Sequence, residues 1–471
     1  MGRHLVGKII VLIEIILSVI FLLAVKRSGL LPDNYFVVLA VILAVLAVFN
    51  MLLQFLKSKI FILGVILSIL VSILSGIGAV AVQSAVQLMD QISALDYQID
   101  NMVVVVRADD PAEELSDIAN YRFGAQNSSD TENTEKMITD IEERLGREIK
   151  VQEYSNIQEE AEALLSGRIE AAVYNDAFTG ILEENIEDYS SQIKVIYQYG
   201  VETPVETVQG EANDVLQPFN LYVSGIDVDG PISTTSRSDV NIIVSVNPQE
   251  HKILLTTTPR DYYVTIPGIS EEQRDKLTHA GIYGVNKSIE TLENLYGIDI
   301  SYYVRVNFTS VVKIVDALGG VDVDSPYAFT TTHGNYEIKQ GMNHLNGEMA
   351  LGFARERYSF SSGDNQRGKN QEILLEALIN KAMSPAILRN TGTLISTLGE
   401  NVETNMGSDQ ISTLINWQLS SGGSWTIESQ AAIGAGDTQA CFSSGSQPLY
   451  VMWPNEDSVN NISEKIKDLM K

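Results

Sequence analysis

The sequence has little of what several common functions require. It contains one cysteine, Cys441, so an intrachain disulfide is impossible and the folded parts depend on core packing. Its five histidines show neither an HExxH motif nor paired spacing, which argues against a zinc metallohydrolase. Lys and Arg number 32 against 60 Asp and Glu, and a net charge of -28 argues against nucleic-acid binding, which needs a basic face. A Walker loop, a GxSxG elbow and a complete GxGxxG motif are missing as well.

Long apolar runs, by contrast, fill residues 1–83. Three of them, Ile9–Val25, Tyr35–Leu56 and Lys59–Val82, approach or reach the ~20 residues that a bilayer span requires. The first run lacks a small-residue cleavage site, so a cleaved signal peptide is not expected. Three transmembrane helices are predicted, and three buried core helices are the alternative. Glu14 falls inside the first run near its amino-terminal end, which favours snorkelling to the interface over a functional role.

The basic residues near the span ends predict the orientation. Arg3 and Lys8 precede the first span, and Lys57 and Lys59 separate the second from the third. The positive-inside rule places these groups in the cytoplasm, although the basic pair at 26–27 opposes it. We therefore expect a multi-pass cell-membrane protein whose large carboxy-terminal part is extracytoplasmic. Such a part without disulfides suits a Gram-positive bacterium.

After the spans, the pattern predicts an α/β protein in several parts. Residues 84–100 are expected to form a helical stalk, 101–200 a small accessory α/β domain, 201–217 a polar linker and 218–471 a larger α/β domain. The accessory domain is expected to have strands at Met102–Arg107, Ile149–Tyr154, Ala171–Tyr174 and Ile193–Tyr199, and helices at Thr131–Leu145 and Ile157–Leu165. Its loops show no recognisable catalytic constellation, so a structural or partner-binding role is expected.

The first strands of the larger domain bring charged residues to one sheet edge. Strands are predicted at Phe219–Gly225, Asp239–Val246 and Lys252–Thr258, and the short Asn247-Pro248 turn makes the last two an antiparallel hairpin. If the first strand also pairs antiparallel, its following loop meets the end of the third strand. The residues that then collect at this edge are Asp227, Arg237, Asp239, Arg260 and Asp261.

Further arginines cluster where two predicted helices meet. Helices are expected at Gly347–Arg355 and Gln366–Met383, with Asp364 as the N-cap of the second. Arg367 and Gln371 share a face of its first two turns, where free N–H groups favour an anion. Together with Arg355 and Arg357, they match a phosphorylated ligand held with a hard metal ion. The alternative is a set of surface salt bridges to Glu356 and Asp364.

Apolar segments of the larger domain leave two interpretations open. They are Val240–Val246, Ile253–Leu255, Val311–Leu318 and Ile373–Ile379. Periodicity fits a packed core and fits equally a tunnel for a long hydrocarbon tail. Other elements expected in this domain are helices at Val285–Tyr296, Thr309–Leu318, Gln410–Leu419 and Asp457–Met470, and strands at Ser301–Val306, Trp425–Ser429 and Leu449–Trp453.

Several motifs are similar to those of the LytR-CpsA-Psr family. They are SGID at Ser224–Asp227, SRSDV at Ser236–Val240, TTTPRD at Thr256–Asp261, DKLTHAGIYG at Asp275–Gly284, VNFTS at Val306–Ser310, LGGVDV at Leu318–Val323 and GFARERYSF…GDNQRGKNQ at Gly352–Gln371. The resemblance runs from about Asn220 to Lys381. The three spans and the accessory domain resemble the streptococcal capsule branch, CpsA. The resemblance implies an α-β-α sandwich with a mixed central sheet and a lipid tunnel inside it.

The family resemblance also implies an activity. Its members transfer a glycopolymer, such as capsular polysaccharide, from a polyprenyl-pyrophosphate carrier to peptidoglycan, with Mg²⁺ or Mn²⁺. The expected partners are therefore the lipid-linked glycan, peptidoglycan, the membrane and other capsule-assembly proteins, and no nucleic acid. A polyprenyl-pyrophosphate pyrophosphatase and a non-enzymatic lipid-binding regulator of capsule synthesis are the alternatives.

The family's site residues carry over onto matching positions. Asp227 and Asp239 resemble the metal ligands, and Lys276, Arg305 and Asp364 fall in motif positions with supporting roles. The residues that resemble the pyrophosphate clamp are Arg237, Arg260, Arg355, Arg357, Arg367 and Gln371. The catalytic set is Asp239, Arg260 and Asp261, and the choice of general base between the two aspartates stays open.

Overall fold

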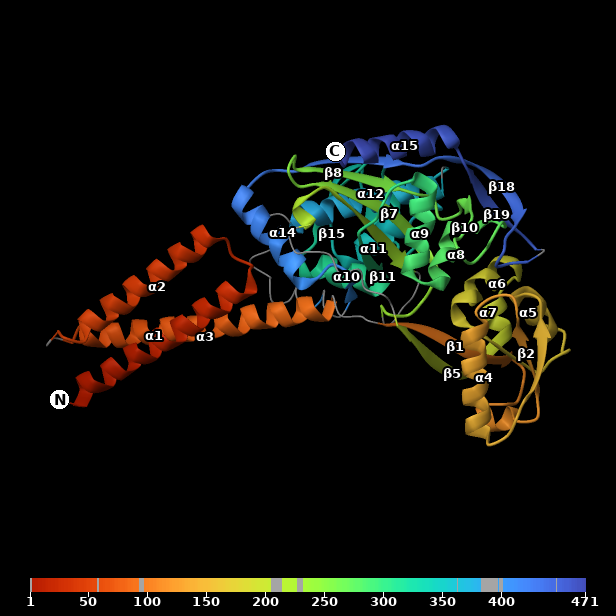
Figure 1. The fold of residues 1–471 in the computed structure, drawn as a ribbon, viewed down its shortest axis with the longest axis horizontal. Helices are drawn as coiled ribbons and strands as arrows, with labels where there is room; N and C mark the ends of the chain where they lie inside the picture. Colours follow the sequence, from red (N-terminus) through yellow and green to blue (C-terminus); the bar gives the residue numbers. More distant parts are fainter. Residues whose placement is uncertain are drawn as a thin grey trace.

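Three long helices extend to one side of two α/β domains in the computed structural model (Figure 1). The structure describes residues 2–56, 59–92, 97–204, 214–226, 232–361, 363–382, 397, 401–445 and 447–471. Helices α1 (Gly2–Ser28), α2 (Asp33–Leu53) and α3 (Phe61–Ile92) are long and apolar enough to cross a membrane. Most of their large apolar side chains are exposed, so the alternative of three buried core helices is wrong. The protein is anchored to the membrane by its amino-terminal part.

Glu14 does not snorkel, contrary to the prediction. Its side chain is completely buried, and both carboxylate oxygens accept hydrogen bonds from Asn50 Nδ2 on α2, at 3.0 and 3.1 Å. Polar groups at membrane depth must be satisfied inside the protein, and Asn50 provides this partner. The pair therefore fixes how α1 packs against α2.

The accessory domain is a five-stranded sheet with helices on both faces. Its strand order is β3-β2-β4-β1-β5. The strands are β1 (Tyr97–Arg107), β2 (Arg122–Gln126), β3 (Lys150–Tyr154), β4 (Ala171–Asn175) and β5 (Ile193–Pro204). The helices are α4 (Thr131–Leu145), α5 (Ile157–Leu165), α6 (Thr179–Asn185) and α7 (Tyr189–Gln192), with 3-10 turns η1 (Leu115–Ile118) and η2 (Asp176–Phe178). The end of the predicted stalk, 97–100, belongs to β1, and the start of the predicted linker, 201–204, belongs to β5.

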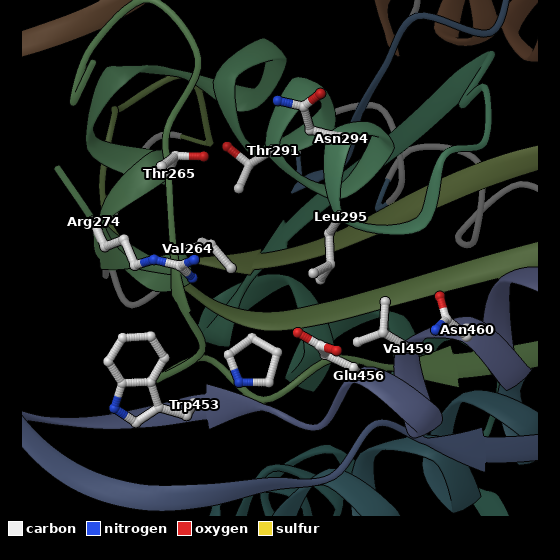
Figure 2. Close-up of a pocket in the computed structure, with 11 residues that line it drawn as sticks. Val264, Thr265, Arg274, Thr291, Asn294, Leu295, Trp453, Glu456, Val459 and Asn460 are labelled. Atoms are coloured by element: carbon white, nitrogen blue, oxygen red, sulfur yellow. The ribbon is translucent and has the colours of Figure 1, made fainter. Parts of the chain in front are cut away.

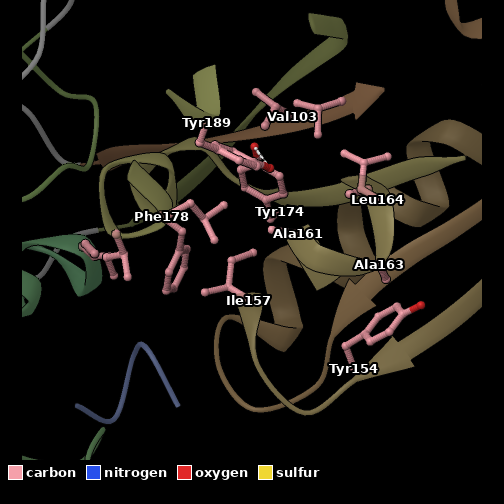
Figure 3. Packing of buried hydrophobic residues seen from close by; sticks show 14 of the residues in the cluster. Val103, Tyr154, Ile157, Ala161, Ala163, Leu164, Tyr174, Phe178 and Tyr189 are labelled. Carbon is pink, nitrogen blue, oxygen red and sulfur yellow. Dashed lines mark hydrogen bonds between the residues drawn. The ribbon is translucent and has the colours of Figure 1, made fainter. Parts of the chain in front are cut away.

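The accessory domain shares its core with the larger domain. Figure 3 shows the cluster under β1 and β4, where the Tyr174 and Tyr189 hydroxyls lie 3.1 Å apart. The same cluster includes Ile282, Leu449 and Val451 of the larger domain. Backbone bonds add to this contact, because Ile99 N donates to Ser233 O at 2.9 Å. The accessory domain is thus packed firmly against the larger one, with α6 near the junction.

The larger domain is an α-β-α sandwich around a mixed six-stranded sheet, as predicted. The strand order is β16-β11-β6-β7-β8-β17. These strands are β6 (Phe219–Ile226), β7 (Ser238–Asn247), β8 (Lys252–Thr257), β11 (Tyr302–Asn307), β16 (Glu403–Thr404) and β17 (Thr426–Ala431). The pairs β6–β7 and β7–β8 are antiparallel, whereas β11–β6 and β17–β8 are parallel. The predicted hairpin at Asn247-Pro248 is confirmed.

Alternating side chains of β7 pack against the two helical layers. Ile243 belongs to the core beneath α9 (Val285–Tyr296) and α15 (Glu456–Leu469). Its neighbours Ile242 and Val244 pack on the opposite face, against α12 (Asp364–Ala382) and α14 (Ser408–Ser421). This alternation is the period-2 pattern of a strand buried on both faces.

Smaller elements complete this domain. They are β9 (Tyr263–Val264), β10 (Asp275–Lys276), β12 (Val321–Ser325), β13 (Phe329–Thr330), β14 (Glu337–Ile338), β15 (Gly341–Leu345), β18 (Gly434–Ala440), β19 (Pro448–Pro454), α8 (Leu277–Ala280), α10 (Phe308–Ala317), α11 (Gly347–Arg355), η3 (Asp214–Leu216) and η4 (Gly281–Tyr283). The short pair β13–β14 lies between the two strands of the pair β12–β15 in the sequence.

Candidate active site

One pocket of about 510 Å³ gathers the arginines that lie far apart in the sequence. The predicted residues that line it are Arg237, Asp239, Arg260, Arg355, Arg357, Arg367 and Gln371. β7 begins at Ser238 and the antiparallel β8 ends at Thr257, so the segments around both ends meet at one edge of the sheet. The end of α11 and the first turns of α12 supply the remaining side chains. The sheet edge and the two helices therefore build one cationic pocket, as the sequence predicted.

Asp239 lines this pocket and is held as a carboxylate. Arg260 Nη1 donates to its Oδ1 at 2.7 Å, and Thr278 Oγ1 donates to the same oxygen at 3.1 Å. Burial raises the pKa of Asp239, but the positive charges of Arg260, Arg237 and Arg367 outweigh burial and bring the pKa to about 2. Asp239 is therefore ionised at neutral pH.

Asp261 and Lys276 lie beside the pocket rather than among its lining residues. Lys276 Nζ is 2.8 Å from Asp261 Oδ1, and the lysine side chain is only 3% exposed. Burial lowers the pKa of Lys276, but the carboxylates of Asp261 and Glu184 outweigh it and raise the pKa overall. Arg260 Nε lies 3.9 Å from Asp261 Oδ1, so this ion pair supports the arginine from behind.

Glu184 of the accessory domain enters the same pocket, and the sequence did not predict it. Its Oε2 accepts from Lys276 Nζ at 2.7 Å and its Oε1 from Arg237 Nη1 at 3.2 Å. Arg260 Nη2 lies 3.8 Å from Oε1. Burial raises the pKa of Glu184, but Lys276, His279 and Arg260 outweigh it and lower the pKa overall. No sequence signal separates this glutamate on a short helix from the other acidic residues of the chain.

Aromatic rings hold Arg355 and Arg357. The Arg355 guanidinium lies 4.0 Å from the centroid of the Phe308 ring. The Arg357 guanidinium lies 4.7 Å from the Tyr358 ring centroid, and its Nη2 donates to the Tyr358 hydroxyl at 2.6 Å. Cation–π contacts fix a guanidinium without cancelling its charge. Both arginines therefore remain available to an anion.

The salt-bridge alternative at Glu356 is not found among the described contacts. Glu356 is 2% exposed, and it accepts hydrogen bonds from Thr332 and Ser359. Burial raises the pKa of Glu356, but these bonds outweigh it and lower the pKa overall. Glu356 therefore fixes the loop beside the arginines. Gln371 Nε2 in turn donates to Ala354 O at 3.3 Å and joins α12 to α11.

The remaining predicted residues lie elsewhere or outside the described part. Arg305 is buried on β11, where Nη2 donates to Ile232 O at 2.6 Å and lies 2.5 Å from Glu403 Oε2. It does not line the pocket and supports the β11–β16 edge. Asp364 is the first residue of α12. Asp227 lies outside the described residues.

Within the described residues, no three His, Cys, Asp or Glu side chains group as a ready-made metal site. Mg²⁺ commonly binds one or two carboxylates together with substrate phosphates. The ionised Asp239, which faces the pocket, fits such an ion. Asp239 is the one predicted metal ligand that lies within the described residues, and it offers a single carboxylate to such an ion.

The sandwich and the three amino-terminal helices define a membrane-anchored α/β protein with an arginine-lined pocket. A model of the LytR_cpsA_psr family matches residues 184–467, more than half of the chain, so the protein belongs to the LytR-CpsA-Psr family. The match begins at Glu184, one of the accessory-domain residues that line the pocket. A second model, DNA polymerase processivity factor, matches residues 57–174. That segment joins a membrane helix to part of the accessory domain. Its acidic residues outnumber its basic ones, so this match gives no support to a DNA-binding role.

Two relatives that match this chain carry the name of a transferase. The chain is 36% identical over 204 residues to the polyisoprenyl-teichoic acid–peptidoglycan teichoic acid transferase TagU of Oceanobacillus iheyensis, covering 42% of this chain and 61% of that protein. It is 32% identical over 234 residues to TagU of Bacillus anthracis, covering 49% and 75%. The crystal structure of B. subtilis TagV matches with 27% identity and a TM-score of 0.47, over 54% of this chain and 98% of that one. The chain thus spans less than two thirds of the Oceanobacillus relative.

Proposed function

We propose that this protein transfers a glycopolymer from a polyprenyl-pyrophosphate carrier to peptidoglycan on the outer side of the cell membrane. The observation that carries the proposal is the convergence of five arginines and the ionised Asp239 in one pocket of a strongly acidic chain. Guanidinium groups bind phosphate oxygens bidentately and stay charged at any biological pH. The names of the TagU relatives support a carrier-linked glycopolymer as donor and peptidoglycan as acceptor. The accessory domain and the three spans favour a capsular polysaccharide or a related polymer as cargo.

The reaction is an in-line phosphoryl transfer. A sugar hydroxyl of peptidoglycan attacks the phosphorus that bears the glycan, the bond from this phosphorus to the lipid phosphate breaks, and lipid monophosphate leaves. The arginines of the pocket neutralise the charge that develops on the phosphate oxygens. A carboxylate with a pKa of about 2 is a weak base at neutral pH, so Asp239 is better suited to hold a cation than to take the hydroxyl proton. Asp261, which lies beside the pocket and pairs with Lys276, is the other predicted base and would take the proton of the attacking hydroxyl.

Asp239 and, from the family resemblance, Asp227 would hold a divalent cation, Mg²⁺ or Mn²⁺. When bound, such an ion supplies positive charge to the diphosphate oxygens. The contacts of Asp239 prepare it for this role, because Arg260 and Thr278 both bind Oδ1 and fix the orientation of the carboxylate.

The carrier's hydrocarbon chain would leave the pocket along the apolar side of α12. Val240 lines the cationic pocket and is only partly buried. It belongs to the same apolar cluster as Leu375 and Ile379 of α12, which are also partly buried. The tunnel that the family resemblance implies would run along these partly buried apolar side chains. The membrane helices would keep the pocket close to the bilayer in which the carrier resides.

One experiment distinguishes glycan transfer from the two alternative functions, pyrophosphatase and lipid-binding regulator. The full chain in lipid vesicles is incubated with lipid-linked glycan, with and without peptidoglycan. We expect polymer-linked peptidoglycan only when the acceptor is present, and loss of one pocket cation should slow the reaction by about 10²–10³. Release of free polymer at the same rate in both samples would identify a pyrophosphatase, and binding without turnover would identify a lipid-binding regulator. A loss under threefold for Arg260→Ala would count against the assignment of the pocket.

A further inference from the structure

A second pocket, of about 680 Å³, lies in the larger domain between β9, β19 and helices α9 and α15 (Figure 2). Thr265 and Arg274 line it from the β9–β10 side, Asn294 from α9, Trp453 from β19, and Glu456 and Asn460 from α15. Figure 2 shows these side chains around one central space. The elements meet here because α9 and α15 pack side by side on the same face of the sheet.

The chemistry of this second pocket differs from that of the arginine pocket. One arginine and one glutamate provide its charges, and the other polar groups include the hydroxyl of Thr265 and the amides of Asn294 and Asn460. Thr291 is buried, and its hydroxyl donates to Lys287 O at 2.6 Å. Hydroxyl and amide groups both donate and accept hydrogen bonds. A ligand rich in hydroxyl groups has the same mixed character, whereas a phosphate only accepts. The lining therefore suits a sugar and not a second phosphate.

Trp453 gives the pocket a fixed aromatic wall. Its Nε1 donates to Asp437 Oδ2 at 3.0 Å, and its ring packs edge-on against Tyr263 with centroids 4.9 Å apart. The Arg274 guanidinium lies 5.1 Å from the ring centroid and donates through Nη1 to Tyr263 O at 2.8 Å. Trp453 as a whole residue is 37% exposed. A rigid, partly exposed ring offers an apolar surface to the C–H face of a pyranose at little entropic cost.

Two connections place this pocket next to the cationic one. Lys276 of β10, which supports the arginine pocket, pairs with Tyr263 of β9. The next residue of β9, Val264, lines the second pocket. Met452, the residue before Trp453, donates its backbone N–H to Asp261 O at 2.7 Å. Val264, which lines the second pocket, follows Asp261 by three residues.

We propose that this second pocket is a saccharide subsite that binds a glycan chain beside the diphosphate site. The inference rests on the proposed function, since the glycan is either the polymer being transferred or the acceptor strand of peptidoglycan. Both are chains of hydroxyl-rich sugars, and the chemistry of the pocket is common to them.

Binding is measured by calorimetry on the full chain in detergent micelles with two probes. A β-1,4-linked N-acetylglucosamine tetrasaccharide represents the peptidoglycan strand, and a phosphate-free oligosaccharide released from the wall polymer of the same cells represents the cargo. We expect saturable binding of one of them. The double variant Asn294→Ala/Asn460→Ala should weaken it by about tenfold, because two hydrogen bonds are lost. The matched control is Asn461→Ala, since Asn461 is exposed on the same helix but does not line the pocket.

The probe that binds identifies the source of the glycan. The inference is overturned if neither sugar binds the wild type, or if the double variant binds as well as the control variant. Inorganic pyrophosphate, titrated into the same proteins, should bind equally to all of them. If the wild type transfers glycan but binds neither sugar, the subsite is wrong and the proposed function stands. If the sugars bind as expected but transfer does not occur, the saccharide subsite stands and the proposed function fails.

Discussion

Neutralising Glu184 should increase the affinity of the pocket for diphosphate. This accessory-domain carboxylate contacts Lys276, Arg237 and Arg260, and so occupies the position of a bound anion. A diphosphate must either displace it or bind beside its negative charge. The variant Glu184→Gln keeps the shape of the side chain and removes the charge.

The magnitude follows from Coulomb's law. At an effective dielectric constant of about 20, one unit charge roughly 8 Å from another contributes about 2 kcal/mol, which is about thirtyfold in affinity. The same substitution removes ion pairs between the two domains, so the free energy of unfolding should fall. An affinity that rises while stability falls distinguishes this effect from general damage to the fold.

The assay is calorimetric titration of the full chain with inorganic pyrophosphate, with and without Mg²⁺. Glu183→Gln is the matched control, because Glu183 lines the same pocket but accepts a hydrogen bond from Ser190 instead of contacting the arginines. We expect Glu184→Gln to bind at least tenfold more tightly than wild type and Glu183→Gln to change by less than threefold. Equal or weaker binding by Glu184→Gln would refute the view that Glu184 competes with the ligand.

Three further predictions follow from the other contacts. Glu160 is fully buried, and burial outweighs its hydrogen bond from Val173 N, so its pKa rises to about 8. Because the native carboxyl binds its proton more tightly than the unfolded one, the free energy of unfolding should fall as pH rises from about 4.5 to 8. Chemical denaturation should show that Glu160→Gln removes this loss, which is about 3 kcal/mol at pH 7. Arg355→Gln should lower the transfer rate by about 10²–10³ with an unchanged melting temperature, since its ring contact with Phe308 is local; a loss below threefold would exclude Arg355 from the clamp. Chelation of divalent ions should abolish transfer, Mn²⁺ should restore it, and Asp239→Asn should weaken Mn²⁺ binding measured by electron paramagnetic resonance; full activity in chelator would contradict the metal proposal.

Local sequence patterns predicted most elements of the larger domain, because their ends carry strong signals. Helix α9 has the predicted bounds, and glycines with positive φ end it at Gly297 and end α10 at Gly319. The prediction that Arg237 and Arg260 meet at one sheet edge followed from the short hairpin turn at Asn247-Pro248. Strand β2 was missed because its five residues include Gly124 and a polar end, so the alternation is weak.

Other features depend on contacts between distant segments, which periodicity does not encode. The partner of Glu14 is Asn50 on the next helix, and only the packing of α1 against α2 brings them together. Asp261 carries the same kind of side chain as Asp239, but it pairs with Lys276 and does not line the pocket. Local sequence predicts that such groups exist and where their elements lie, whereas the tertiary structure decides which of them reach the ligand.

The position of Glu184 makes the accessory domain part of the active site and not an appendage. The core beneath α6 continues into Ile282 and Val451 of the larger domain, so α6 cannot move freely without exposing apolar side chains. A carboxylate on a helix fixed in this way holds a constant place opposite the arginines. It reduces the positive charge that the pocket presents and thereby favours ligands with enough negative charge to compete with it. A diphosphate meets this condition better than a single phosphate, so the accessory domain would help the pocket to select the charged carrier over its monophosphate product.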